Sequence, residues 1–548
     1  MRSGEQEKAP VLAGQKGFWK NLARALGAGF VVLFVLGHLS PVIREVTFDE
    51  SNLVYDAHRI LEGQVPYRDF FAFIPPGGLY LMSGGPWGWW GRPETGVRWV
   101  MALAVLIAWG LSWRALKRAA VSADFPAGRI ASLLPIVVFP YAVSGIHHWM
   151  ATAWYIAAIA AWIAILTGGS GTHRWLVLGI LVGTTGCFLQ TEGVFGFLLV
   201  GIGVLFSGGT GREVARRAGV ASCGLGLAFL ALVGPLACFG ALEAFFHDVV
   251  LWTLTNYRHS GNINDVALLV DMPDRFRSLW AFTGRSIGVA EIAAALSGSL
   301  LYVGLLFLVG LSLAVSVKVL LGIGITRRIP HPEMTIATAL TIFSFGVFCN
   351  SGPTWVHLVY LFPPCFLLWG VVLARTPLGK KAQSGLRCAV SSLLLLGVLC
   401  HGSLLARHIP RPWELLDVDR VDRESPLNES LRKSALIGEG DTIAVLPTGG
   451  NVYLYTFPAA IGYTYFFPLK DRLHDLEDHE VAAAQMEKAR PALVLIHLAT
   501  YSDFLVPEDP VGALVLKDYR EVTRTPALVV LARKDRLPPS PRSTRGQS

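Results

Sequence analysis

Two acidic side chains stand where the chain first emerges from a long apolar stretch. Asp49 and Glu50 follow the apolar residues 22–42 and precede a second apolar stretch at 97–116. Carboxylates are common proton-transfer groups, and ionisable residues close to lipid are costly enough to be functional candidates by default. Each also has a structural interpretation, because Thr47 and Glu50 have the spacing of a capping box and Asp49 could interact with a helix dipole. We predict Asp49 and Glu50 as the catalytic candidates.

Other polar residues recur near the same predicted surface, and several suit the binding of an anionic group. Arginine and histidine donate charge-assisted hydrogen bonds to phosphate oxygens, and arginine can donate two in parallel. Every member also has a structural alternative, as an interfacial anchor, a helix cap or an ordinary loop residue. The predicted substrate-binding residues are Tyr67, Arg68, His147, His148, Gln190, Glu192, Tyr257, Arg258 and His357.

The elements that must position these residues are transmembrane helices. Of the 548 residues, 53% are hydrophobic and only 16% are charged, and apolar runs of about 18 or more residues recur, long enough to span a bilayer. The formal net charge of +8 lies mainly in short connections between these runs, which is the positive-inside pattern and argues against nucleic-acid binding. The seven cysteines include no CxxC pair, so the sequence predicts neither a disulfide framework nor a zinc site.

Placing the Lys- and Arg-rich connections in the cytoplasm gives about eleven transmembrane helices, with the N-terminus inside and the C-terminus outside. In this arrangement all the candidate residues lie at outer helix ends or in outer loops. The fold class is therefore a mainly α-helical, multi-pass membrane protein. The predicted spans include 22–42, 97–116, 130–144, 149–167, 218–241, 289–317, 335–349 and 389–405, and a long outer loop follows the span that ends at residue 241.

The first outer loop has the pattern of a short amphipathic helix lying in the membrane interface. Its apolar face comprises Leu53, Val54, Ala57, Ile60 and Leu61, its charged face comprises Asp56, Arg59 and Glu62, and Gly63 is placed to end it.

The composition changes after about residue 407, where charged residues and prolines return. Short strand-like stretches and one helical pattern then predict a small extracytoplasmic α/β domain; the strands are expected at 442–446, 492–498 and 527–532, and the helix at 475–490. The predicted domains are a cytoplasmic tail at 1–20, a membrane domain at 21–407, the α/β domain at 408–537 and a disordered tail at 538–548.

The first outer loop resembles that of bacterial GT-C glycosyltransferases, which include relatives of the protein O-mannosyltransferases and the aminoarabinose transferases. The residues that carry this resemblance are Asp49-Glu50, Tyr55, Ala57, Leu61-Glu62-Gly63, Val65-Pro66-Tyr67-Arg68-Asp69 and Pro75-Pro76-Gly77. Three later segments are similar to segments of that superfamily: Gln190-Thr191-Glu192-Gly193, Asn256-Tyr257-Arg258, and the stretch from His357 to Pro364. The resemblance covers about residues 23–407. It departs at Phe73-Ile74, where many relatives have a lysine or arginine before the Pro-Pro pair.

The resemblance implies a protein of the bacterial cytoplasmic (inner) membrane that transfers a sugar from a polyprenyl-phosphate carrier to an envelope lipid, glycan or protein on the outer face. It implies Asp49 as the general base and Glu192 as an orienting group. Donors to the departing phosphate would be Arg258, Tyr257, His357 and Arg68. A single displacement would invert the anomeric centre. The reaction requires no cofactor, and the sequence decides neither for nor against a divalent metal.

Two other classes stay open. A transporter or flippase of lipid-linked saccharides would also be polytopic, although its polar residues would be expected at mid-membrane in related halves, and no internal repeat is visible. A polysaccharide ligase or polymerase that uses a pyrophosphate-linked donor would favour a large outer loop rich in arginine and histidine. The predicted loop after residue 241 has several such residues.

Overall fold

The computed structural model describes residues 48–85, 93–138, 146–168, 171–255, 289–326, 332–350, 358–406, 436–438, 441–446, 476–497, 505–524 and 528–537. The predicted first span, Thr47 of the expected capping box, and the candidates Tyr257, Arg258 and His357 lie outside these residues.

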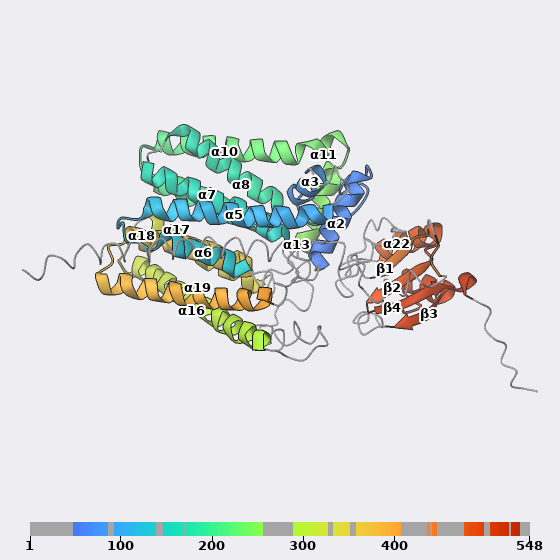
Figure 1. Ribbon diagram of the computed structural model, residues 1–548. Helices are drawn as coiled ribbons and strands as arrows, with labels where there is room; N and C mark the ends of the chain where they lie inside the picture. The colour runs from blue at the N-terminus through green and yellow to red at the C-terminus, as the bar shows by residue number, and fades with distance from the viewer. Residues whose placement is uncertain are drawn as a thin grey trace, which may run out of the picture.

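Long helices packed side by side form the body of the protein (Figure 1). Four described segments are long and apolar enough to cross a membrane, namely His147–Thr167, Gly211–Leu232, Leu296–Ile325 and Lys380–Cys400, and shorter apolar helical segments accompany them. The predicted membrane protein is thus confirmed, while the number of eleven spans stays a prediction. The helices are α5 (Pro93–Ala119), α6 (Ala127–Val138), α7 (Ile146–Gly168), α8 (Thr172–Phe188), α9 (Gln190–Phe206), α10 (Gly211–Leu232), α16 (Val289–Thr326), α17 (Pro332–Asn350), α18 (Leu358–Arg375) and α19 (Lys380–Ala406).

Helices α8 and α10 approach each other so closely at three glycines that no side chain fits at these positions. A Cβ atom added to Gly224 of α10 would lie 2.8 Å from the backbone nitrogen of Ile180, and one added to Gly183 of α8 would lie 2.8 Å from the Ala228 Cβ. Small residues at a helix crossing are the usual way to gain van der Waals contact within a membrane, where the hydrophobic effect does not drive association.

The span predicted at 218–241 differs from the helix observed there. Helix α10 begins earlier, because Thr210 and Glu213 form a reciprocal capping box. It ends at Leu232, and three short helices follow: α11 (Gly234–Cys238), α12 (Leu242–Phe245) and α13 (Thr253–Thr255), with the π-helix η1 (Phe246–Trp252) between the last two. The beginning of the predicted outer loop is therefore helical.

The predicted helix is confirmed as α2 (Phe48–Leu61), while its position in the membrane interface stays a prediction. A second short helix, α3 (Gly77–Gly84), follows it. Leu53, Val54 and Ala57 are buried, as their spacing predicts, whereas Leu61 at the end of the same face is exposed. The expected charged face is wrong in one respect, because the Arg59 side chain is buried at 3% exposure. The loop after α2 folds back over this arginine.

The C-terminal elements form a four-stranded sheet with the order β1-β2-β4-β3. The strands predicted from the sequence are β1 (Ile443–Leu446), β2 (Leu493–His497) and β4 (Leu528–Arg533), and the predicted helix is α22 (Leu476–Ala489). Strand β3 (Tyr519–Arg524) and helix α24 (Pro510–Asp518) were not predicted. Strands β1 and β2 are parallel, whereas β4 is antiparallel to both β2 and β3.

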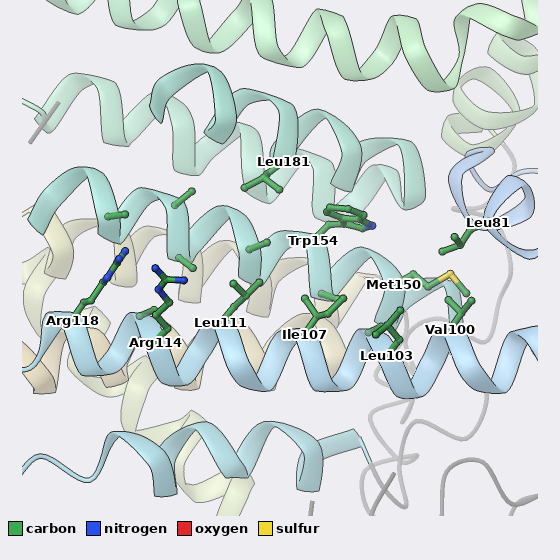
Figure 2. Close-up of a pocket in the computed structure, with 17 residues that line it drawn as sticks. Leu81, Val100, Leu103, Ile107, Leu111, Arg114, Arg118, Met150, Trp154 and Leu181 are labelled. Atoms are coloured by element: carbon green, nitrogen blue, oxygen red, sulfur yellow. The ribbon is translucent and has the colours of Figure 1, made fainter. Parts of the chain in front are cut away.

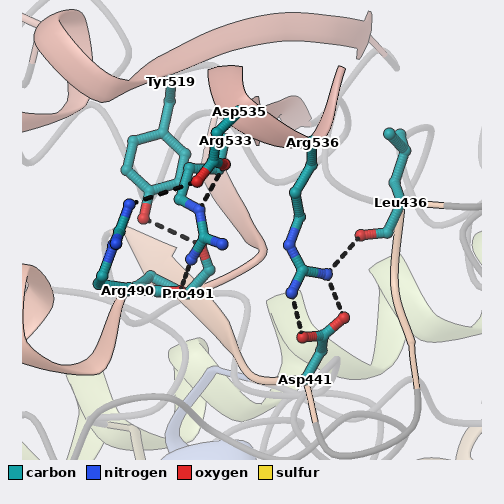
Figure 3. Close-up of polar contacts among 8 residues, drawn as sticks. All are labelled: Leu436, Asp441, Arg490, Pro491, Tyr519, Arg533, Asp535 and Arg536. Carbon is teal, nitrogen blue, oxygen red and sulfur yellow. Dashed lines mark hydrogen bonds and ion pairs between the residues drawn. The ribbon is translucent and has the colours of Figure 1, made fainter. Parts of the chain in front are cut away.

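Polar contacts join the residues that follow β4 to the residues that precede β1 (Figure 3). The Arg536 guanidinium binds both carboxylate oxygens of Asp441, and this hydrogen-bonded pair lowers the pKa of Asp441. The Tyr519 hydroxyl donates to the Pro491 carbonyl at 2.9 Å. Figure 1 shows the sheet beyond the end of the helical bundle at which α2 and α3 lie.

Candidate functional site

One buried cation fixes the loop that follows α2. The Arg59 Nε donates to Gln64 Oε1 at 2.7 Å, and its Nη2 donates to the Asp69 carbonyl at 3.1 Å. The guanidinium also lies over the Phe70 ring, 4.3 Å from the centroid. Gly63, with φ of +90°, supplies the left-handed turn that glycine adopts without strain. The loop is therefore held in a single conformation against the helix that carries Asp49.

Residues 65–69 form a closed turn that uses two of the predicted binding residues structurally. The Asp69 carboxylate accepts from the Val65 amide at 2.7 Å, and the Val65 carbonyl accepts from the Asp69 amide at 2.9 Å. Arg68 forms an ion pair with Asp69 at 2.8 Å and thereby lowers the pKa of that carboxyl. Tyr67 is buried, adopts φ of +70°, and donates its hydroxyl proton to the Ile74 carbonyl at 2.8 Å.

The π-helix η1 packs against this loop and brings in a carboxylate that sequence reasoning missed. Asp248 is 3% exposed; its Oδ2 accepts from the Ala72 amide at 3.4 Å, and its Oδ1 lies 3.0 Å from His247 Nδ1. The Tyr67 ring meets Phe245 edge-on at 5.2 Å. Short π-helical segments occur frequently at functional sites. The sequence signal was present, since an aspartate inside an apolar helical stretch is costly unless it has a partner.

Gln190 joins the first loop to the π-helix. Its Nε2 donates to the Phe73 carbonyl at 3.1 Å and lies 3.5 Å from the Val249 carbonyl. The predicted pair His147 and His148 lies in the first turn of α7. Both rings are buried, and they are tilted by 36° with their centroids 4.0 Å apart. Helix α3 packs over them, because a Cβ on Gly78 would lie 4.0 Å from the His147 Cβ.

Glu192 points to a different place from Gln190, although only two residues separate them. Its fully buried Oε1 accepts a hydrogen bond from the Thr152 hydroxyl of α7. It does not cap α9, since the N-cap residue is Leu189 and no side chain bonds there. Among the described residues, neither Glu192 Oε2 nor the Tyr155 hydroxyl has a hydrogen-bond partner. Glu192 therefore belongs to a buried polar site between α7 and α9.

The electrostatics around Tyr67 indicate a group of interacting ionisable side chains. Burial raises the pKa of the Asp56 carboxyl to about 7, although the nearby Arg59 charge opposes this shift. Burial, followed by Tyr80, Asp248 and Asp56, holds the pKa of Tyr67 well above its usual range. A carboxyl that titrates near neutral pH is suited to proton transfer. Asp56 is the second functional candidate that the sequence reasoning passed over.

The structure places the catalytic candidates only by their backbone. Asp49 and Glu50 lie in the first turn of α2, and their side chains fall outside the described part. No group of three or more histidine, cysteine, aspartate or glutamate side chains that could hold a metal ion occurs among the described residues. Tyr67, Arg68 and Gln190 are brought together with Asp56 and Asp248, whereas Glu192 is not.

A bundle of apolar helices with a polar loop fixed over one end is the fold of a polytopic membrane protein. No protein-family model matches the chain, and no curated protein matches it in sequence. Solved structures are nevertheless similar to it. The crystal structure of ArnT from Cupriavidus metallidurans bound to undecaprenyl phosphate aligns over 94% of this chain and 99% of that chain, with a TM-score of 0.53 and 12% identity.

Two further solved structures align at lower scores. The archaeal oligosaccharyltransferase AglB from Archaeoglobus fulgidus, in complex with an inhibitory peptide and a dolichol-phosphate, matches over 94% of this chain and 75% of its own, with a TM-score of 0.44 and 13% identity. The arabinofuranosyltransferase AftD from Mycobacteria matches over 93% and 40%, with a TM-score of 0.42 and 12% identity. The ArnT alignment spans nearly the whole of both chains and shows that this chain has an ArnT-like, mainly helical fold.

Proposed function

We propose that this protein is an integral-membrane glycosyltransferase that moves a sugar from a polyprenyl-phosphate carrier to an envelope acceptor on the outer face of the cytoplasmic membrane. The observation that carries this proposal is the likeness in fold to ArnT over 94% of the chain, combined with a first loop of the GT-C type. A likeness in fold alone does not fix an activity, so the site must supply the chemistry.

The orientation follows from charge. Basic side chains lie in the last turns of α5 and α18 and at the start of α19, and Figure 1 shows these helix ends at the end of the bundle opposite α2 and α3. Under the positive-inside rule this end faces the cytoplasm. The first loop, the π-helix and the C-terminal sheet are then extracytoplasmic.

An apolar cavity beside the first loop suits the carrier lipid. It has a volume of about 650 Å³ and is lined by Gly77 and Tyr80 of α3, Phe188 of α8 and Leu232 of α10. A polyprenyl chain in this cavity would have its phosphate next to the loop. ArnT was crystallised with undecaprenyl phosphate, a lipid of this class.

The proton acceptor in this proposal is Asp49. It lies seven residues before Asp56 in the sequence, which is about two helical turns, so the two positions share a face of α2. Asp56 faces the group around Tyr67 and Asp248. As general base, Asp49 accepts the proton of the acceptor hydroxyl while the oxygen attacks the anomeric carbon and the carrier phosphate departs. The displacement inverts that carbon. Arg258, Tyr257 and His357 are the proposed donors to the phosphate, whereas the Arg68 guanidinium is bonded to Asp69 and to the Phe239 carbonyl.

The test compares lipid-linked sugars and envelope glycans by mass spectrometry in a deletion strain complemented with variants. Asp49→Asn is expected to lower transfer by about 10²–10⁴-fold, the usual contribution of a general base, and to accumulate the lipid-linked donor. Glu62→Gln is the matched control, because it makes the same acid-to-amide change at an exposed position of the loop that follows α2. It should restore wild-type glycans.

Two results would contradict different parts of the proposal. Full activity of Asp49→Asn would remove the base assignment and leave the enzyme class standing. A deletion strain whose glycans and lipid-linked sugars do not change would remove the glycosyltransferase function itself. Equal amounts of both variants in the membrane, measured by immunoblot, exclude a trivial loss of protein.

A further inference from the structure

A second apolar cavity runs between α5 and α7, and we call it the α5–α7 groove (Figure 2). Its volume is about 560 Å³. Leu103, Ile107 and Leu111 line it from α5 at helical spacing, and Trp154 and Ala157 face them from α7. The α7 wall consists largely of alanines, whose short side chains leave the space open. Leu103, Ile107 and Trp154 are exposed, so the groove is open on one side within the part of the chain that the structure describes.

The groove extends over most of the membrane thickness. From Val100 to Arg118, α5 rises about 27 Å at 1.5 Å per residue, close to the roughly 30 Å of a hydrocarbon core. A groove of this length that begins near the headgroups of one leaflet therefore ends near the headgroups of the other. Figure 2 shows Leu81 and Met150 at one end of the groove and Arg114 and Arg118 at the other.

Two arginine side chains lie at the end of the α5–α7 groove that is farther from α2 and α3. Arg114 and Arg118 are one helical turn apart, and both point from α5 toward α7 (Figure 2). Arg118 also lines an adjoining, more polar cavity together with His173 and Arg174 of α8. The apolar groove thus opens at this end into a basic surface.

Acidic side chains within the described part do not neutralise this surface. Neither Arg114 nor Arg118 forms a hydrogen bond or ion pair with a residue that the structure describes. The acidic residues described at this end contact other groups. Asp124 pairs with Arg387, Glu213 caps α10, and Glu333 pairs with Arg375.

We propose that the α5–α7 groove holds an anionic phospholipid, with its phosphate on Arg114 and Arg118 and one acyl chain along the apolar wall. Guanidinium groups bind phosphate through short, charge-assisted hydrogen bonds, and basic pockets between helices on the cytoplasmic side are a recurring binding mode for anionic lipids. The polyprenyl-phosphate donor fits this end poorly, because its phosphate would lie at the far end of the bundle from the first loop. This site is independent of the proposed glycosyl transfer.

The experiment is native mass spectrometry of the full-length protein in detergent, titrated with phosphatidylglycerol or with phosphatidylcholine of the same acyl chains. Wild type is expected to retain phosphatidylglycerol at least about tenfold better. The double variant Arg114→Gln/Arg118→Gln should lose that preference, since each lost charged hydrogen bond weakens binding by about an order of magnitude. Lys117→Gln is the control, because Lys117 lies between the two arginines in sequence but contacts the Trp113 ring at 5.5 Å and does not line the groove.

A second variant tests the groove separately from the charge. Ala160→Phe fills the apolar wall and leaves both arginines in place, so it should also lower phosphatidylglycerol retention, with wild-type behaviour on size exclusion. Equal retention of both lipids by wild type, or unchanged retention by the arginine double variant, would overturn the proposal. So would displacement of phosphatidylglycerol by equimolar undecaprenyl phosphate in an arginine-dependent manner, because the groove would then belong to the donor.

Discussion

The clearest pH dependence should come from Asp56. Its folded-state pKa is about 7, whereas an aspartate in an unfolded chain titrates near 3.9. Between these values the folded protein binds a proton that the unfolded chain releases. The free energy of unfolding therefore falls as the pH rises from about 4 to about 7, and this loss is complete above that range. Asp56→Asn removes the titrating group and keeps the side-chain shape.

The difference between the folded and unfolded pKa of Asp56 determines how much the free energy of unfolding changes with pH. About three pKa units correspond to about 4 kcal/mol at about 1.4 kcal/mol per unit. Asp56 is only partly buried, and solvent screening reduces this to about 2 kcal/mol. At pH 8 the variant should therefore be more stable than wild type by about 2 kcal/mol, and at pH 4 the two should be nearly equal. Arg59 keeps its bonds to Gln64 and to the Asp69 carbonyl, so the loop should stay in place.

The assay is thermal unfolding in detergent at pH 4, 5, 6, 7 and 8, with Glu62→Gln as the exposed control. The difference in Tm between Asp56→Asn and wild type should grow with pH, while the control should follow wild type. A difference that is the same at every pH would refute the reasoning, because it would show that the Asp56 pKa does not change on folding.

Three further substitutions test the packing around the site. Tyr67→Phe removes the bond to the Ile74 carbonyl and should lower stability by about 1 kcal/mol, measured as Tm against Tyr80→Phe; equal effects would show that the bond contributes nothing. Asp248→Ala leaves the Ala72 amide without its acceptor and should lower the free energy of unfolding by about 1–3 kcal/mol, whereas Asp248→Asn should lower it less. The reverse order of the two variants in thermal unfolding would contradict this geometry. Gly224→Leu forces α8 and α10 apart and should abolish the monodisperse size-exclusion peak. Gly226→Leu should keep that peak, because the Cβ position of Gly226 has open space around it, and identical profiles of the two variants would rule out the close helix contact.

The regular elements could be predicted because their signals are local. Helix α2 shows its apolar face at Leu53, Val54 and Ala57, and Gly63 ends it where a left-handed turn is required. Strands β1, β2 and β4 are continuous apolar runs, as expected for strands covered on both faces. Strand β3, with the sequence Tyr-Arg-Glu-Val-Thr-Arg, is mostly polar at the sheet edge and therefore gave no such signal.

The site could be predicted only in part, because its decisive contacts join distant segments. Arg59 was expected on a solvated face, but the loop that covers it is fixed by Asp69 and Phe70. Asp248 reaches the first loop through a π-helix, whose register cannot be read from apolar periodicity. The roles of Asp49, Glu50, Tyr257, Arg258 and His357 stay predictions.

The close contact of α8 with α10 limits how the bundle can open. Their backbones touch at Gly183 and Gly224, so these two helices behave as one rigid plate, and the α3 side of that plate lines the cavity proposed for the carrier lipid. Widening that cavity cannot come from a hinge between α8 and α10. We therefore expect any widening of that cavity to come from displacement of α3 or α7 relative to this pair of helices.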